Sequence, residues 1–147
     1  MDEAERQRYE AGLKTRREVL GASYVDQALA NADEFTQPFQ EYVTTQAWHS
    51  VWNRPGLDRR TRSIINLAVL TALGRSQELA LHVRGALNNG VTPEEIREVF
   101  IQLGGYAGFP AAVEAFRTAQ PIVAEHRRAG GRAQTADEEP GHIHRDR

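Results

Sequence analysis

The chain contains no cysteine, and this absence excludes several kinds of chemistry. Without thiols the protein has no disulfide, no cysteine nucleophile, no redox-active cysteine pair and no zinc–thiolate centre. Long apolar runs are also missing, since no segment approaches the roughly 18 residues that span a bilayer. The charged first residues, Met1 to Arg6, lack the apolar stretch of a secretory signal peptide. We therefore expect a cytoplasmic protein with no membrane partner.

An excess of charge of either sign is missing as well. The 18 lysines and arginines nearly balance the 20 aspartates and glutamates, which leaves a net charge of −2. This balance gives no long-range attraction for nucleic acid, so we expect no nucleic-acid partner. At 147 residues the chain suits one domain. A domain of that size buries roughly 70% of its unfolded surface and needs no structural metal.

Strand patterns are nearly absent, and helical periodicity fits the chain up to about residue 128. The sequence therefore predicts an all-α domain over residues 1–128. We expect its helices at residues 3–20, 23–31, 33–52, 59–73, 75–89, 93–103 and 110–127. Residues 129–147 are polar and almost without large apolar side chains, which predicts a disordered C-terminal tail.

Two of these segments carry specific structural expectations. The helix at residues 59–73 is apolar around most of its circumference, so we expect it to be central and buried on most sides. After residue 103, the glycines Gly104, Gly105 and Gly108 predict a loop around Tyr106.

The helix at residues 75–89 holds the most informative side chains. Arg75, Glu78 and His82 are three and four residues apart, so they share one face. His82 is the candidate for proton transfer or for stabilising an oxyanion, because histidine titrates near neutral pH. Glu78 could orient the imidazole and raise its pKa. The alternative is an ordinary glutamate–histidine pair on an exposed helix face.

Several short segments, taken in order, resemble a known family. They are Tyr9-Glu10-Ala11-Gly12, Arg16-Arg17-Glu18-Val19-Leu20-Gly21, Tyr24-Val25-Asp26, Phe39-Gln40-Glu41, Ala47-Trp48, Val51-Trp52-Asn53-Arg54-Pro55-Gly56-Leu57, Arg60-Thr61-Arg62-Ser63, His82-Val83-Arg84, Asn88-Asn89-Gly90-Val91 and Glu94-Glu95-Ile96. Each segment alone is weak, but their order and spacing are specific. Over residues 9–125 the chain resembles the carboxymuconolactone decarboxylase family of the alkylhydroperoxidase D-like superfamily.

This resemblance implies a fold, an assembly and an activity. The fold is the all-α, alkylhydroperoxidase D-like helical domain, assembled as a ring-like homo-oligomer, a hexamer. The activity is the decarboxylation, without any cofactor or metal, of 4-carboxymuconolactone to 3-oxoadipate enol-lactone. That reaction belongs to the protocatechuate branch of the β-ketoadipate pathway. The expected partners are thus a small dicarboxylate lactone and further copies of the chain.

With the resemblance, four more residues become site candidates. We expect Arg75 and Arg62 to bind substrate carboxylates, because a guanidinium matches a carboxylate with two parallel hydrogen bonds. Their alternative is a solvated or ion-paired surface position. Trp48 and Trp52 are four residues apart and share a face. They are either core residues or an apolar wall that excludes water from the site.

Other readings of the same scaffold remain open. Peroxidases of the superfamily use two cysteines, a glutamate and a histidine; here Arg75, Glu78 and Ser63 stand at the first three positions, and only His82 remains. With no thiol to reduce a peroxide, the sequence excludes that activity. A decarboxylase or isomerase of a related lactone or keto acid, and a non-catalytic oligomeric binding protein, are the alternatives.

Overall fold

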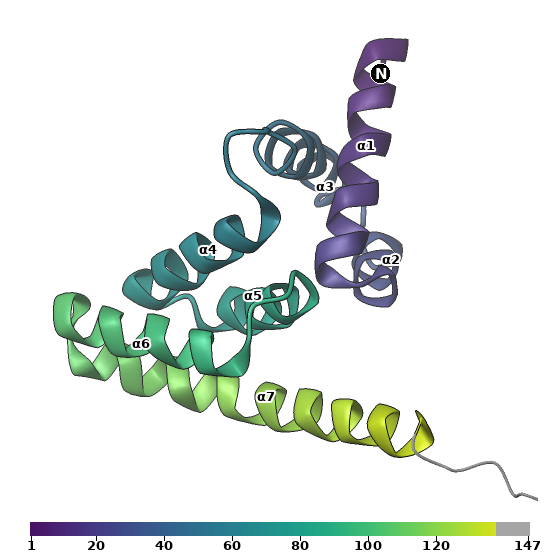
Figure 1. Ribbon diagram of the computed structural model, residues 1–147. Helices are drawn as coiled ribbons and strands as arrows, with labels where there is room; N and C mark the ends of the chain where they lie inside the picture. Colours follow the sequence, from purple (N-terminus) through teal and green to yellow (C-terminus); the bar gives the residue numbers. More distant parts are fainter. Residues whose placement is uncertain (138–147) are drawn as a thin grey trace, which may run out of the picture.

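The computed structural model describes residues 1–137 of the chain, and the side chains of residues 1–132. Within this part all regular structure is helical, which confirms the predicted all-α class. The elements are α1 (Glu3–Leu20), α2 (Ala22–Ala30), α3 (Gln37–Val43), the π-helix η1 (Thr44–His49), α4 (Arg59–Leu73), α5 (Ser76–Asn88), α6 (Pro93–Ala107) and α7 (Phe109–Asp137) (Figure 1). Among the described helices, none is long and apolar enough to cross a membrane.

Side-chain caps fix where several helices begin. The Asp58 carboxylate accepts the backbone N–H of Thr61 at 2.7 Å, immediately before α4. At the start of α6, Thr92 and Glu95 each bond the other's backbone N–H in a capping box. Such caps satisfy N–H groups that have no partner inside the helix and contribute about 1 kcal/mol each. These local signals set the helix starts that frame the site.

Two clusters of buried apolar side chains hold the helices together. The larger cluster packs α4, α5, α6 and α7 around Leu67, Val83 and Phe100. The smaller one joins Val19 of α1 to Trp48 and Trp52. Helix α5 lies between the N-terminal helices and the group formed by α4, α6 and α7 (Figure 1). It contacts α1 on one side and α4 and α7 on the other. A side chain on α5 can therefore face either cluster.

Helix α4 is buried on one face only, so the expectation that it is buried on most sides is wrong for the single chain. The buried side chains are Ser63, Leu67 and Thr71. Ile65, Val69 and Leu73 form an apolar stripe that is exposed. An exposed apolar stripe of this kind is typical of a surface that another protein covers. The apolar pattern is present on α4, but the sequence does not show which of its apolar side chains are buried within the chain.

The glycine loop predicted around Tyr106 is wrong, because α6 continues through Tyr106 to Ala107. Gly104 serves the packing of α6 on α7. A Cβ atom at this position would lie 3.1 Å from the Cβ of Ala112 and 3.2 Å from the Cδ1 of Phe109. This glycine therefore permits close helix contact, and it does not break the helix.

Helix α7 is longer than the sequence predicts, since it runs to Asp137 and its second half projects past α6 (Figure 1). Residues 129–137, which were expected to be disordered, continue this helix. The remainder of the predicted tail, residues 138–147, lies outside the described residues.

The single helix expected at residues 33–52 is replaced by α3, η1 and a following turn. In η1 the helix widens, and backbone bonds reach back five residues, from the N–H of Ser50 to the carbonyl of Thr45 (3.1 Å) and from Trp52 to Ala47 (3.0 Å). Such π-helical turns are rare and frequently occur at functional sites. Here the π-helix carries Trp48, and the turn that follows it carries Trp52.

Candidate active site

His82 lies where α5 meets the smaller apolar cluster. One face of α5 buries Leu79, Val83 and Ala86 in the larger cluster. The neighbouring face turns the imidazole towards Trp48 and Trp52. One face of α5 thus packs in the core, and the neighbouring face carries His82.

Three aromatic rings form the centre of the candidate site. The indole rings of Trp48 and Trp52 stack with centroids 5.1 Å apart and planes 15° apart. The His82 ring lies 6.1 Å from Trp48 and 6.3 Å from Trp52, and its plane is within 12° of both. Both tryptophans are almost fully buried. The structure thus brings together three of the predicted site residues. It shows the two tryptophans as core residues, and their role as a wall of the site stays a prediction.

Burial controls the charge of His82. Desolvation lowers the pKa of its imidazole, and the nearby Glu78 carboxylate raises it by a smaller amount. The net direction is downward, because the imidazolium is poorly solvated where it is buried against two indoles. Its Nδ1 atom is buried and has no hydrogen-bond partner within the described chain. His82 is therefore neutral at pH 7, with an N–H that can be directed at a substrate.

Glu78 acts at a distance from His82. The carboxylate is exposed, and the described residues show no hydrogen bond between it and the imidazole. Its predicted role in orienting the ring stays a prediction, and its electrostatic effect opposes that of burial. The ring is oriented instead by the two tryptophans.

Arg62 provides a cation beside the Trp52 ring. A cavity of about 110 Å³ is lined by Val51, Trp52, Arg62, Ile65 and Asn66. The Nη2 of Arg62 donates to the backbone carbonyl of Arg54 at 3.0 Å, while its Nε is buried without a partner in the described part of the chain. A buried, unpartnered guanidinium N–H is costly, so a carboxylate is a fitting occupant.

Arg75 is placed differently from Arg62. It is exposed at the N-terminal cap of α5, and no described contact connects its side chain to the three rings. Its role in binding a carboxylate stays a prediction. Ser63 is buried, and its hydroxyl accepts a hydrogen bond from the Asn89 amide at 2.9 Å. This position, which holds a glutamate in the peroxidases, here ties α4 to the end of α5.

Asn66 is a candidate that the sequence analysis missed. It follows Arg62 by one helical turn on α4 and lines the same cavity. The four-residue spacing was the signal that could have found it. A side-chain amide can donate a hydrogen bond to a carboxylate or a carbonyl oxygen held beside Arg62.

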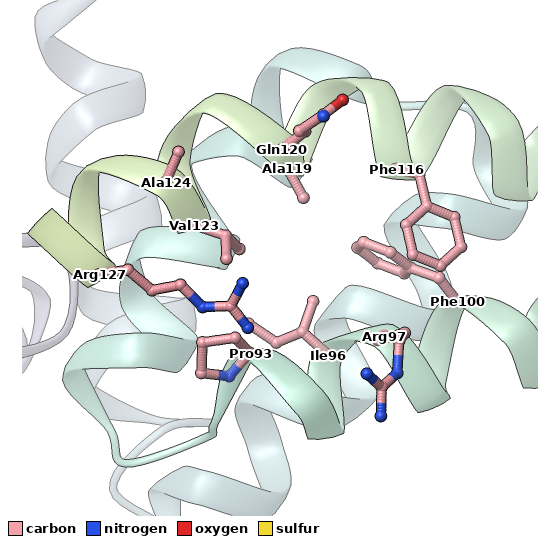
Figure 2. Close-up of a pocket in the computed structure, with 10 residues that line it drawn as sticks. All are labelled: Pro93, Ile96, Arg97, Phe100, Phe116, Ala119, Gln120, Val123, Ala124 and Arg127. Atoms are coloured by element: carbon pink, nitrogen blue, oxygen red, sulfur yellow. The ribbon is translucent and has the colours of Figure 1, made fainter.

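A larger groove, of about 520 Å³, lies between α6 and α7 (Figure 2). Its floor is apolar, and its polar lining consists of Arg97, Gln120 and Arg127. Arg127 is already paired with Glu94 at 2.9 Å. No group that donates or accepts protons near neutral pH lines this groove. The site at His82 is therefore the better candidate for acid–base chemistry. Within the described residues, no cluster of three histidine or acidic side chains could hold a metal.

The protonation of His82 can be followed directly, because Trp48 and Trp52 are the only tryptophans of the chain. An imidazolium quenches a stacked indole, so intrinsic fluorescence should fall as the pH falls, with a midpoint below 6.5, the ordinary value for histidine. Stability should decrease with pH below 6.5 and level off below the folded pKa, since the unfolded chain binds the proton more tightly. A midpoint above 6.5 would show that cation–π attraction outweighs burial.

Fold and site together define an all-α domain in which a buried histidine stacks against two tryptophans, and an arginine lines a cavity beside one of them. The model of the carboxymuconolactone decarboxylase family matches residues 37–121, a segment that holds these four residues. The chain belongs to the carboxymuconolactone decarboxylase family, which confirms the resemblance seen in the sequence.

Relatives that are named for different substrates have similar sequence identity to this chain. A 4-carboxymuconolactone decarboxylase of Acinetobacter baylyi is 47% identical over 116 residues, which cover 79% of this chain and 87% of that protein. A nitrosuccinic acid decarboxylase of Metarhizium robertsii is 46% identical over 122 residues, 83% of this chain and 85% of that protein. A 4-carboxymuconolactone decarboxylase of Pseudomonas putida is 46% identical over 43 residues, 29% of this chain and 90% of that protein.

Proposed function

We propose that the protein is a cofactor-free decarboxylase of a small dicarboxylic acid, with 4-carboxymuconolactone as its substrate. The observation that carries this proposal is the buried His82 ring stacked against two buried indoles, one of which, Trp52, lines a cavity with the unpartnered N–H of Arg62. The relative of the same activity at 47% identity supports the choice of substrate.

The chemistry of 4-carboxymuconolactone matches these groups. The carbon–carbon bond to the departing carboxylate breaks, and its electron pair moves through the ring double bond to the lactone carbonyl oxygen. CO2 leaves, and the resulting dienolate takes a proton on the carbon next to the carbonyl to give the enol-lactone. The reaction needs a site for the retained carboxylate, an apolar environment for the departing one, and a donor for the oxyanion.

Each need has a residue at the proposed site. Arg62 binds the retained carboxylate, and Asn66 adds a hydrogen bond from the same helix face. Trp48 and Trp52 exclude water from the departing carboxylate, which favours the loss of its charge as CO2. The N–H of His82 donates to the developing oxyanion, whose negative charge raises the pKa of the imidazole. The imidazole then takes up a proton from solvent, and the resulting imidazolium transfers a proton to the ring carbon next to the carbonyl.

Nitrosuccinate is the second candidate substrate, because the relative named for it is 46% identical over a similar length. Loss of the carboxylate on the carbon that bears the nitro group would give a nitronate, which is then protonated on carbon. This reaction also moves an electron pair onto an oxygen of a small dicarboxylate. The same residues would serve both reactions, so the substrates must be compared directly.

Self-association is part of the proposal. The stripe of Ile65, Val69 and Leu73 on α4 is exposed, and Ile65 also lines the Arg62 cavity. Further large apolar side chains are exposed on the α6–α7 hairpin, namely Ile101, Tyr106, Phe109 and Val113. Surfaces of this kind are typical of protein–protein contacts. They support a homo-oligomer, and the ring-like hexamer is the form that the resemblance implies.

The test is an assay of the purified, metal-stripped protein on both dicarboxylates. We expect release of CO2 from 4-carboxymuconolactone, with formation of the enol-lactone, at a kcat/KM at least tenfold above that for nitrosuccinate. The opposite order would assign the chain to nitrosuccinate. Release from neither acid, by protein with native helical content, would contradict the proposed function.

A further inference from the structure

We propose that α1 is the positioning element of this site, and that Arg16 fixes the π-helical turn so that Trp48 and Trp52 hold the His82 ring. The inference rests on the proposed function, since it concerns the same three rings. It adds a role for residues that lie outside the cavity.

Arg16 is an unusual residue for a core. It is 6% exposed, and within the described chain no carboxylate lies within ion-pair distance of it. Its Nη1 donates to the Gln40 side chain at 2.9 Å and to the Thr44 hydroxyl at 3.2 Å, while its Nε has no partner. Burying a cation without a counter-ion costs stability. A buried cation that costs stability and donates its hydrogen bonds to α3 and η1 points to a positioning role.

The contact between α1 and η1 is also unusually close. A Cβ atom built on Gly12 would lie 2.2 Å from the backbone carbonyl oxygen of Thr44 and 3.1 Å from the backbone nitrogen of His49. Gly12 and Arg16 are one turn apart on α1, so both contact the start of η1 from the same face. Thr44 is thus held through its carbonyl side and through its hydroxyl.

Helix α1 also contacts the residue that follows Trp52 and the helix α5 that carries His82. The Thr15 hydroxyl donates to the Asn53 side chain at 2.8 Å, just after Trp52. The carbonyl of Val19 accepts from the Asn88 amide of α5 at 2.7 Å, and the Val19 side chain packs against both indoles. Helix α1 therefore fixes both ends of residues 44–53, which carry the two tryptophans, and the distance of these residues from α5.

The variant Arg16→Met tests this role, because it keeps the length of the side chain and removes its donors. We expect kcat to fall about tenfold with KM changed less than twofold. The midpoint of the tryptophan fluorescence titration should rise towards 6.5, as loosened rings admit water to His82. Arg16→Lys, which retains a donor, should recover at least half of the lost kcat.

The matched control is Arg17→Met on the neighbouring residue of α1. Arg17 is exposed and pairs with Asp26 on α2, so its loss should change neither kcat nor the fluorescence midpoint. Thr44→Val provides a milder second variant that removes only the hydroxyl acceptor. It should shift both readouts in the same direction as Arg16→Met, by a smaller amount.

The outcomes separate this inference from the proposed function. If Arg16→Met and Thr44→Val unfold more easily but keep the wild-type kcat and midpoint, Arg16 is only structural and the inference is overturned. The fluorescence titration needs no substrate. A shifted midpoint in protein that turns over neither dicarboxylate would therefore support the positioning role and reject the decarboxylase.

Discussion

Replacing His82 with phenylalanine should lower kcat by roughly a thousandfold, the range lost when a proton donor or an oxyanion donor is removed. A phenyl ring keeps the stack with Trp48 and Trp52 but has no N–H, so the core should stay packed. The measurement is kcat on whichever dicarboxylate the wild-type protein turns over. Circular dichroism and thermal unfolding, recorded in parallel, report whether the fold is retained.

Two further variants make this result specific. His126→Phe, on the exposed part of α7, is the matched control and should leave kcat unchanged. His82→Gln restores an N–H that can bond the oxyanion but cannot deliver a proton. Activity about tenfold above that of His82→Phe would assign His82 mainly to oxyanion stabilisation. A folded His82→Phe protein that retains more than a tenth of the wild-type kcat would remove His82 from the mechanism.

Replacing Gly12 with alanine should cause the largest loss of stability, about 3 kcal/mol or more, at the upper end for overpacked sites. The added Cβ would lie 2.2 Å from the Thr44 carbonyl oxygen. That atom belongs to the backbone of η1 and cannot rotate away, so α1 has to separate from η1. For a chain of this length we expect a decrease in Tm of about 6–12 °C.

Gly105→Ala is the control for this prediction. Gly105 also lies inside a helix, α6, but an added Cβ would meet nothing within 4 Å. Alanine is the better helix former by about 1 kcal/mol, so this variant should be slightly stabilised. The two glycine variants are compared by urea unfolding. A midpoint for Gly12→Ala equal to that of the wild type would show that the α1–η1 contact adapts at little cost.

The sequence predicts the local features well and the contacts between helices poorly. Periodicity and caps located the helices, including the face of α5 that bears His82. The exception is residues 33–52, where the structure replaces one expected helix with α3, η1 and the turn that holds Trp52. A local pattern does not contain the packing between helices. Gly104, for example, is read as a helix breaker from the sequence, whereas in the structure it allows α6 to pack closely against α7. The same holds for the partners of Arg16, which lie 24 and 28 residues away.

The candidate site shows the same division. His82, Trp48 and Trp52 were found from residue type and resemblance, because aromatic and titratable groups are informative on their own. The direction of the His82 pKa could not be predicted, since Glu78 is visible in the sequence while desolvation by two distant indoles is not. For Arg62, the guanidinium suggested carboxylate binding, but only the structure shows its unpartnered Nε.

The π-helical turn also changes the angular phase of the chain. An α-helix rotates by about 100° per residue, so a regular helix through residues 37–52 would present its side chains on one continuous spiral. The extra residue in the wide turn breaks that spiral between Tyr42, which is exposed, and Trp48, which is buried. The side chains of α3 can therefore face solvent while the two indoles that follow face the core. One extra residue in the helix thus separates an exposed helical segment from the buried segment that contacts His82.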